Sequence, residues 1–195
     1  ELGGKGANLL FADADDRAVL RSVKRMMENS GQSCNAPSRL LVERSVYDET
    51  VAKAAEIANA IAVAPAMQPG NHIGPVVNKR QWDQIQGYIQ KGISEGARLV
   101  AGGLGLPEGF NRGYYVKPTV FADVTPGMTI EREEIFGPVI TITPFDTVEE
   151  VLTMANATEY GLAATVWTQH LTRAHQVAAQ LQMGIVWINC WLLRD

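Results

Sequence analysis

Short apolar runs alternate along this chain with longer amphipathic segments, and this alternation constrains the fold more than any other feature. The apolar runs have the length and composition of buried strands, whereas the longer segments repeat apolar residues at helical spacing. Strands that alternate with helices are typical of α/β folds, so we predict an α/β fold with a mainly parallel sheet. The predicted strands are residues 39–42, 99–100, 114–120, 139–143, 162–168 and 185–188.

The amphipathic segments predict helices at residues 12–29, 45–61, 78–96, 148–157 and 173–181. Asp13 or Asp15 is expected to cap the first helix and Ser45 the second, because short polar side chains accept hydrogen bonds from exposed N–H groups. A glycine cluster at residues 102–105 is interpreted as a turn, since no Lys-Ser or Lys-Thr pair follows it as in a phosphate loop.

Composition narrows the class of protein. The 195 residues are 46% hydrophobic and 19% charged, which is typical of a globular chain with one substantial core. The net charge of −4 argues against nucleic acid or an anionic membrane as a partner. No apolar run has the length of a membrane span, and the first residues lack a signal-peptide pattern. The two cysteines do not indicate a disulfide framework, so we expect a reducing, cytoplasmic setting.

The most informative local feature is Cys34 within the sequence NSGQSCNAP, residues 29–37. A thiol is a good nucleophile only as the thiolate, and it needs a clear approach path. Gly31 and the small residues around Cys34 would provide that path. The alternative is a structural cysteine, because free cysteine packs like a small hydrophobic residue. A carboxylate, Glu1, lies 33 positions earlier and is also followed by small residues.

Three motifs occur in a fixed order: ELGGK at residues 1–5, GQSC at 31–34 and EEIFGPV at 133–139. Together they resemble the signatures of the aldehyde dehydrogenase superfamily. The resemblance continues through GYYVKPT at 113–119 and WINCW at 187–191. It implies a parallel-sheet catalytic domain with helices on both faces. It also implies a preceding cofactor-binding domain and further C-terminal residues, which we expect to lie outside residues 1–195.

The resemblance assigns chemical roles to individual residues. Cys34 would be the nucleophile that attacks an aldehyde, and Glu1 the general base that activates water to hydrolyse the resulting thioester. NAD or NADP would accept the hydride. Glu134 and Phe136 match the positions that hold the nicotinamide ribose and ring, and Gln81 matches a position near the cofactor. The Cys34 backbone N–H is a candidate donor to the oxyanion.

The resemblance also implies a substrate pocket at Asn189, Cys190 and Trp191, with Asn189 ordering the catalytic loop. The C-terminal end is similar to enzymes of muconic semialdehydes and the Cys34 region to general bacterial members, so no particular aldehyde is predicted. Lys5 is assigned no catalytic role. No spacing of His, Cys and carboxylate residues is typical of a metal site.

Three alternatives remain open. A relative that transfers the acyl group to coenzyme A is disfavoured by Glu1, because such enzymes often lack that residue. The chain could instead be a catalytic segment that is inactive alone, or a structural protein with a spent active site. The expected partners are a small-molecule aldehyde and, as in many family members, further copies in a dimer or tetramer.

Overall fold

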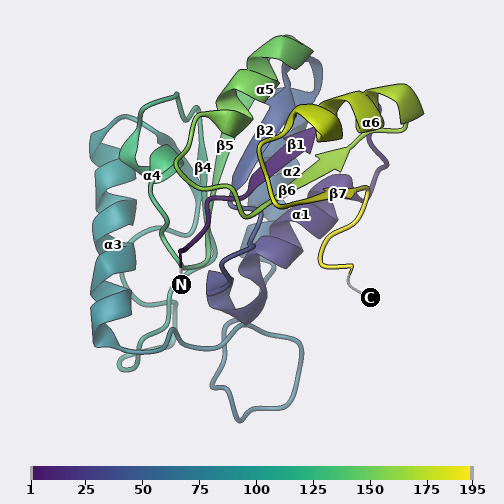
Figure 1. Cartoon of the computed structure of the whole chain (residues 1–195). Helices are drawn as coiled ribbons and strands as arrows, with labels where there is room; N and C mark the ends of the chain where they lie inside the picture. The colour runs from purple at the N-terminus through teal and green to yellow at the C-terminus, as the bar shows by residue number, and fades with distance from the viewer. Residues whose placement is uncertain (1, 194–195) are drawn as a thin grey trace.

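A seven-stranded sheet forms the centre of the molecule (Figure 1). The computed structural model describes residues 2–193. The strand order is β3-β4-β5-β2-β1-β6-β7, and every neighbouring pair is parallel except β3 and β4. The strands are β1 (Ala7–Leu10), β2 (Arg39–Glu43), β3 (Arg98–Ala101), β4 (Thr119–Ala122), β5 (Val139–Phe145), β6 (Ala163–Trp167) and β7 (Ile185–Ile188). The predicted α/β fold with a mainly parallel sheet is confirmed.

Helices cover both faces of this sheet, as the family resemblance implied. They are α1 (Ala18–Met27), α2 (Tyr47–Asn59), α3 (Lys79–Ser94), α4 (Thr129–Arg132), α5 (Val148–Asn156) and α6 (Leu171–Gln180). Two short 3-10 helices, η1 (Glu28–Gly31) and η2 (Arg44–Val46), precede the turn at Cys34 and helix α2, respectively.

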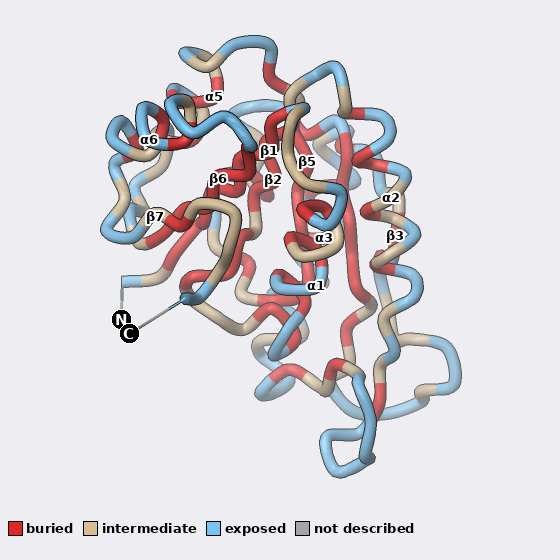
Figure 2. Tube along the Cα trace, turned by 90° about the vertical axis from the view of Figure 1, so that its right-hand side faces the viewer, coloured by how far each residue is buried: buried red, intermediate tan, exposed pale blue. Residues whose placement is uncertain are grey.

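The core divides according to the alternation of side chains along the strands. Leu40 on β2 packs with residues of α1 and α2, whereas its neighbour Leu41 packs with residues of α5 and α6 on the other face. A third cluster joins α3 to β4 through Ile85, Ile89 and Phe121. The buried strands at the centre and the exposed outer faces of the helices are visible in Figure 2.

Two strand predictions need correction. Strand β1 was not predicted, because a polar residue, Asn8, interrupts its short apolar pattern. Conversely, the predicted strand at residues 114–120 begins only at Thr119. Tyr114 O accepts a hydrogen bond from Val76 N–H, and Tyr115 O accepts one from the indole of Trp82. Those carbonyls are therefore engaged by partners outside the sheet.

The first helix begins at Ala18, not near residue 12 as predicted. Ala12 N–H donates to the Glu43 carboxylate, and Asp13 accepts from Thr168, so this segment is bonded to other elements. Neither Asp13 nor Asp15 is the N-cap residue of α1, which is Arg17. Asp15 instead accepts from Arg17 N–H just ahead of the helix.

Ser45 does not cap the second helix as predicted. It lies inside η2, and α2 begins at Tyr47 with no side-chain cap. The helix predicted at residues 78–96 is confirmed as α3, which Asn78 caps by accepting a hydrogen bond from Gln81 N–H.

Candidate active site

The three sequence motifs meet at one edge of the sheet. Strands β5, β2 and β1 are parallel neighbours, so the segments that precede them lie at the same edge. Gly4 precedes β1, Cys34 precedes β2, and Glu134 precedes β5. The predicted general base, Glu1, lies outside the described residues. The candidate site is thus at the amino ends of the strands.

Gly4 makes the contact that joins these motifs. Its N–H donates a hydrogen bond of 2.9 Å to Glu134 Oε1. A Cβ atom at Gly4 would overlap the carbonyl oxygen of Cys34. The backbone at Gly4 therefore lies directly between the Cys34 turn and the Glu134 carboxylate, and any side chain at this position would push them apart.

The turn before Cys34 has a strained backbone. Asn29 and Ser30 adopt φ values of 53° and 56°, a left-handed conformation that residues other than glycine rarely take. Such strain clusters at functional sites and needs support from its surroundings. Support comes from the Ser30 hydroxyl, which donates to Gly74 O at 2.7 Å. Gly31, with φ of 70°, packs so tightly that a Cβ there would overlap the backbone of Gly137.

The Cys34 side chain is half-buried, and its thiol is not part of a disulfide bond. Within residues 2–193, no hydrogen bond engages the Cys34 N–H, which the family resemblance offers as a donor to an oxyanion. The next residue, Asn35, accepts a 3.2 Å hydrogen bond from the Trp191 indole through its carbonyl. Trp191 therefore lies beside the Cys34 turn, and the half-buried Cys190 is its chain neighbour.

The loop that carries Glu134 and Phe136 is held by Gln81 on α3. Gln81 Nε2 donates to Ile135 O at 3.1 Å and to Phe136 O at 2.9 Å. Phe136 has a φ of 53°, so this loop is also locally strained. Both predicted cofactor-binding side chains are half-buried, and a hydrogen bond from Gly4 fixes the carboxylate of one of them. In the described part of the chain, Gln81 thus holds this loop by hydrogen bonds to its backbone carbonyls.

Two buried cations lie behind this loop. The Arg39 guanidinium, 1% exposed, bonds to Glu131 at 3.1 Å and to three carbonyls, one of them that of Lys5. The Lys5 amine has no hydrogen-bond partner among residues 2–193, and the residue is 2% exposed. Burial, followed by the charge of Arg39, lowers the pKa of Lys5 from 10.5 to about 7. Nothing in the sequence pattern signalled this group.

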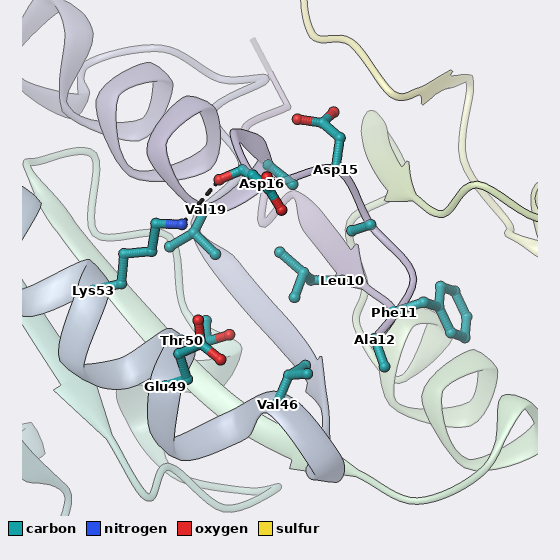
Figure 3. Close-up of a pocket in the computed structure, with 12 residues that line it drawn as sticks. Leu10, Phe11, Ala12, Asp15, Asp16, Val19, Val46, Glu49, Thr50 and Lys53 are labelled. Atoms are coloured by element: carbon teal, nitrogen blue, oxygen red, sulfur yellow. Dashed lines mark hydrogen bonds between the residues drawn. The ribbon is translucent and has the colours of Figure 1, made fainter.

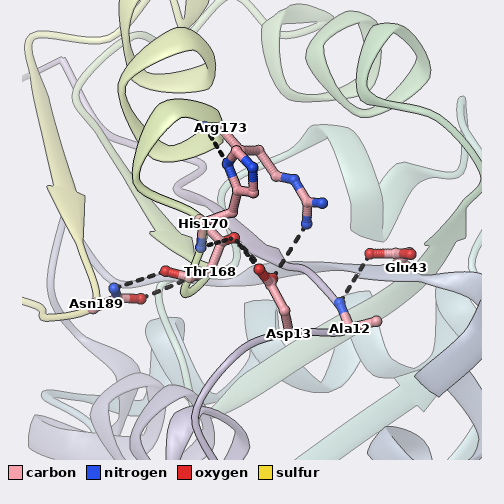
Figure 4. Close-up of polar contacts among 7 residues, drawn as sticks. All are labelled: Ala12, Asp13, Glu43, Thr168, His170, Arg173 and Asn189. Carbon is pink, nitrogen blue, oxygen red and sulfur yellow. Dashed lines mark hydrogen bonds and ion pairs between the residues drawn. The ribbon is translucent and has the colours of Figure 1, made fainter.

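Asn189 lies in a polar cluster at the carboxyl end of β6 (Figure 4). Its side-chain amide accepts from Thr168 N–H and donates to Thr168 O. The Thr168 hydroxyl donates to Asp13, which also pairs with Arg173 at 3.2 Å. The structure therefore brings Trp191, but not the Asn189 side chain, into contact with the Cys34 turn.

A cavity of about 170 Å³ lies at the opposite end of β1 from Gly4 (Figure 3). Leu10, Val19 and Val46 give it an apolar floor, and Lys53 donates to Asp16 O at its rim. Because β1 separates it from the Cys34 turn, this cavity is not part of the candidate site.

No helix in residues 2–193 has both the length and the apolar composition required to cross a membrane. No three His, Cys, Asp or Glu side chains in that range converge as metal ligands would.

The comparisons with known proteins agree with the geometry. The model of the aldehyde dehydrogenase family matches residues 1–195. A crystal structure of an aldehyde dehydrogenase from Bartonella henselae is 55% identical over 100% of this chain and 41% of its own, with a TM-score of 0.98. A mutant of aldehyde dehydrogenase C from Pseudomonas syringae, complexed with NAD+ and octanal, is 42% identical over 100% of this chain and 40% of its own, with a TM-score of 0.97.

A 2-hydroxymuconic semialdehyde dehydrogenase of Pseudomonas sp. is 43% identical over 100% of this chain and 41% of its own length. The chain thus spans about two fifths of the relatives it matches. Sheet order, site and sequence define one class of protein. The chain belongs to the aldehyde dehydrogenase family.

Proposed function

We propose that this chain is the nucleophile-bearing catalytic segment of an NAD(P)-dependent aldehyde dehydrogenase, which oxidises an aldehyde to a carboxylic acid. The observation that carries the proposal is the position of Gly4, which touches the Cys34 carbonyl and donates to Glu134. The nucleophile and the carboxylate that holds the cofactor must be neighbours in the site if an adduct on the thiol is to pass a hydride to a nicotinamide.

The residues present fit a nicotinamide riboside. A carboxylate is a strong acceptor for two ribose hydroxyls, and Glu134 is fixed in place by the Gly4 N–H. Phe136 supplies a flat apolar ring two residues later, and Gln81 fixes its carbonyl. When bound, the nicotinamide supplies the hydride acceptor. Glu134 and Phe136 would orient it, which is the protein's part in such chemistry.

The remaining steps use this chain's own groups. The Cys34 thiolate attacks the aldehyde carbon, and the Cys34 N–H stabilises the oxygen that gains charge in the tetrahedral thiohemiacetal. Loss of the hydride leaves a thioester on the sulfur. Glu1 takes a proton from the water that attacks this thioester, which releases the carboxylic acid and the thiol. Trp191, beside the Cys34 turn, would form part of the substrate pocket together with Cys190.

The test is NAD(P)H formation from a small panel of aldehydes. We would compare the chain alone, the chain grafted into a complete relative, and grafts that carry Cys34→Ala or Cys190→Ala. Cys190 is the matched control because it is the other half-buried free cysteine. We expect activity in the graft and loss of kcat with Cys34→Ala. Cys190→Ala should retain kcat and change at most the KM for the aldehyde, because Cys190 is proposed to line the substrate pocket and not to react. A folded graft that stays silent with every aldehyde would contradict the proposal.

A further inference from the structure

The side-chain amide of Gln32 is hydrogen-bonded at both of its ends, two residues before Cys34. Its Nε2 donates to Asn29 O at 3.1 Å, and its Oε1 accepts from Val77 N–H at 2.8 Å. One end of the amide therefore holds the turn that leads to the thiol, and the other end holds a segment 45 residues further along the chain. The proposed mechanism gives this side chain no task.

The turn needs this support because its backbone is left-handed at three consecutive residues. Asn29, Ser30 and Gly31 have φ values of 53°, 56° and 70°. This conformation is routine only for glycine, with asparagine an occasional exception. The backbone N–H of Gln32 and its Nε2 both donate to Asn29 O, and the Gln32 carbonyl accepts from the Asn29 amide at 2.9 Å. Asn29 and Gln32 thus close the turn between them.

A short segment, residues 74–77, lies beside this turn, and we call it the brace. Its anchor is Val76, which is 2% exposed and belongs to the same core cluster as Ile85 of α3. The Val76 N–H also donates to Tyr114 O at 2.9 Å. The brace leads directly into Asn78, the cap of α3. It is therefore fixed by elements that do not belong to the Cys34 turn.

Both ends of the brace bond to the left-handed turn. Gly74 O accepts from the Ser30 hydroxyl at 2.7 Å, and Val77 N–H donates to the Gln32 side chain. Because the middle of the brace is buried and bonded elsewhere, it offers the strained turn a fixed support.

We infer that Gln32 is a positioning residue for the proposed reaction: its amide links the brace to the left-handed turn and so fixes where the chain places the Cys34 thiol and N–H. The turn also contacts the loop at residues 133–138, which carries the proposed cofactor-binding side chains and which we call the clamp loop. A Cβ at Gly31 would overlap the backbone of Gly137 in that loop. The position of the thiol relative to a nicotinamide therefore depends on how the turn is held, and a misplacement of about 1 Å can cost about a hundredfold in rate.

The catalytic part of this inference rests on the proposed function, whereas the link between the brace and the turn is a property of this chain. Amide hydrogen exchange, followed residue by residue by NMR, tests that link without enzyme activity. We would compare the unaltered chain with Gln32→Met, which keeps the length of the side chain but has no amide. The control is Gln90→Met, since Gln90 is exposed on α3.

The decisive signal is the backbone N–H of residue 32, because its own acceptor, Asn29 O, is unaltered in Gln32→Met. This N–H and that of Val77 should exchange about fivefold faster or more once the amide is lost. The Val76 N–H, whose bond the substitution does not touch, should be unchanged. Unchanged exchange at residue 32 would overturn the inference.

The second experiment uses a complete aldehyde dehydrogenase that carries this segment. We expect Gln32→Met to lower kcat and kcat/KM together, by about tenfold or more, while the KM values for the aldehyde and for NAD+ stay within about twofold. Ser30→Ala, which removes the other bond to the brace, should also lower kcat. Gln90→Met should change neither kcat nor KM.

A merely structural glutamine would lower stability in urea unfolding and leave the kcat of the folded enzyme unchanged, and that result would refute the positioning role. If Gln32→Met does not fold, Gln32→Glu decides in its place, because it keeps the acceptor for Val77 N–H and loses only the donor to Asn29 O. Its kcat should fall as well. An unaltered graft without activity would count against the proposed function, and hydrogen exchange at residue 32 would still decide on the link to the brace.

Discussion

Replacement of Lys5 by methionine should make this protein more stable and should change how its stability depends on pH. The two side chains have similar length, but methionine has no charge to bury. Burial outweighs the attraction of the neighbouring carboxylates, so the folded chain disfavours the charged form of Lys5. We therefore expect Lys5→Met to raise the free energy of unfolding at pH 7.

The magnitude follows from the structure. A fall in the pKa of Lys5 from 10.5 to about 7 corresponds to about 5 kcal/mol against the charged form in the folded state, at about 1.4 kcal/mol per pH unit. Between these two values the unfolded chain holds a proton that the folded chain has lost. The free energy of unfolding should therefore increase with pH, by up to about 1.4 kcal/mol per unit, from about pH 7 towards 10.5.

Urea unfolding at several pH values between about 7 and 9.5 would measure this slope. Tyr47 and Tyr88 do not interfere, because burial raises the pKa of each to about 12 and their effect on stability begins only near the unfolded value of about 10. The control is Lys24→Met, since Lys24 is exposed on α1. Lys5→Met should flatten the slope and Lys24→Met should not. Equal slopes in Lys5→Met and the unaltered chain would refute the reasoning.

Three further substitutions test the supports of the site. Gly31→Ala, which forces a side chain into the backbone of Gly137 at a positive φ, should lower stability by about 3 kcal/mol in urea unfolding and slow alkylation of the thiol. Arg39→Met should cost about 3–5 kcal/mol because it leaves Glu131 buried and unpaired, and Arg39→Met combined with Glu131→Met should recover much of that loss. Gln81→Leu removes two hydrogen bonds to the clamp loop and should raise the KM for NAD+ in a complete enzyme, with unfolding changed by about 1 kcal/mol.

The sequence was sufficient for the fold class because strands such as β5 carry their β-branched residues in one continuous run. Such a run can be recognised without knowledge of any distant contact. The sequence was insufficient where the conformation of a segment depends on a residue far away along the chain. Strand β1 can bury Asn8 because the Trp167 indole donates to the asparagine at 2.7 Å across 159 residues. The start of α1 moves to Ala18 because Ala12 and Asp13 are bonded elsewhere.

The candidate site shows the same division. The motifs around Cys34 and Glu134 were sufficient to predict candidate site residues. Their proximity, however, depends on contacts of Gly4 that the spacing of the motifs does not reveal. The role of Gln81 as a support of the loop carbonyls and the isolation of the Lys5 amine are likewise properties of the packed chain.

The location of the site at the amino ends of the strands has a consequence for a dinucleotide. Helices α1, α5 and α6 each return between parallel strands, so they point their carbonyl ends towards this edge. At α5, two of those carbonyls, from Met154 and Ala155, already accept a guanidinium. Phosphate needs the opposite, N–H ends of helices. The N–H ends of α1, α5 and α6 therefore lie at the opposite edge of the sheet, so none of these three helices can offer its N–H end to the phosphates of a dinucleotide bound at the candidate site.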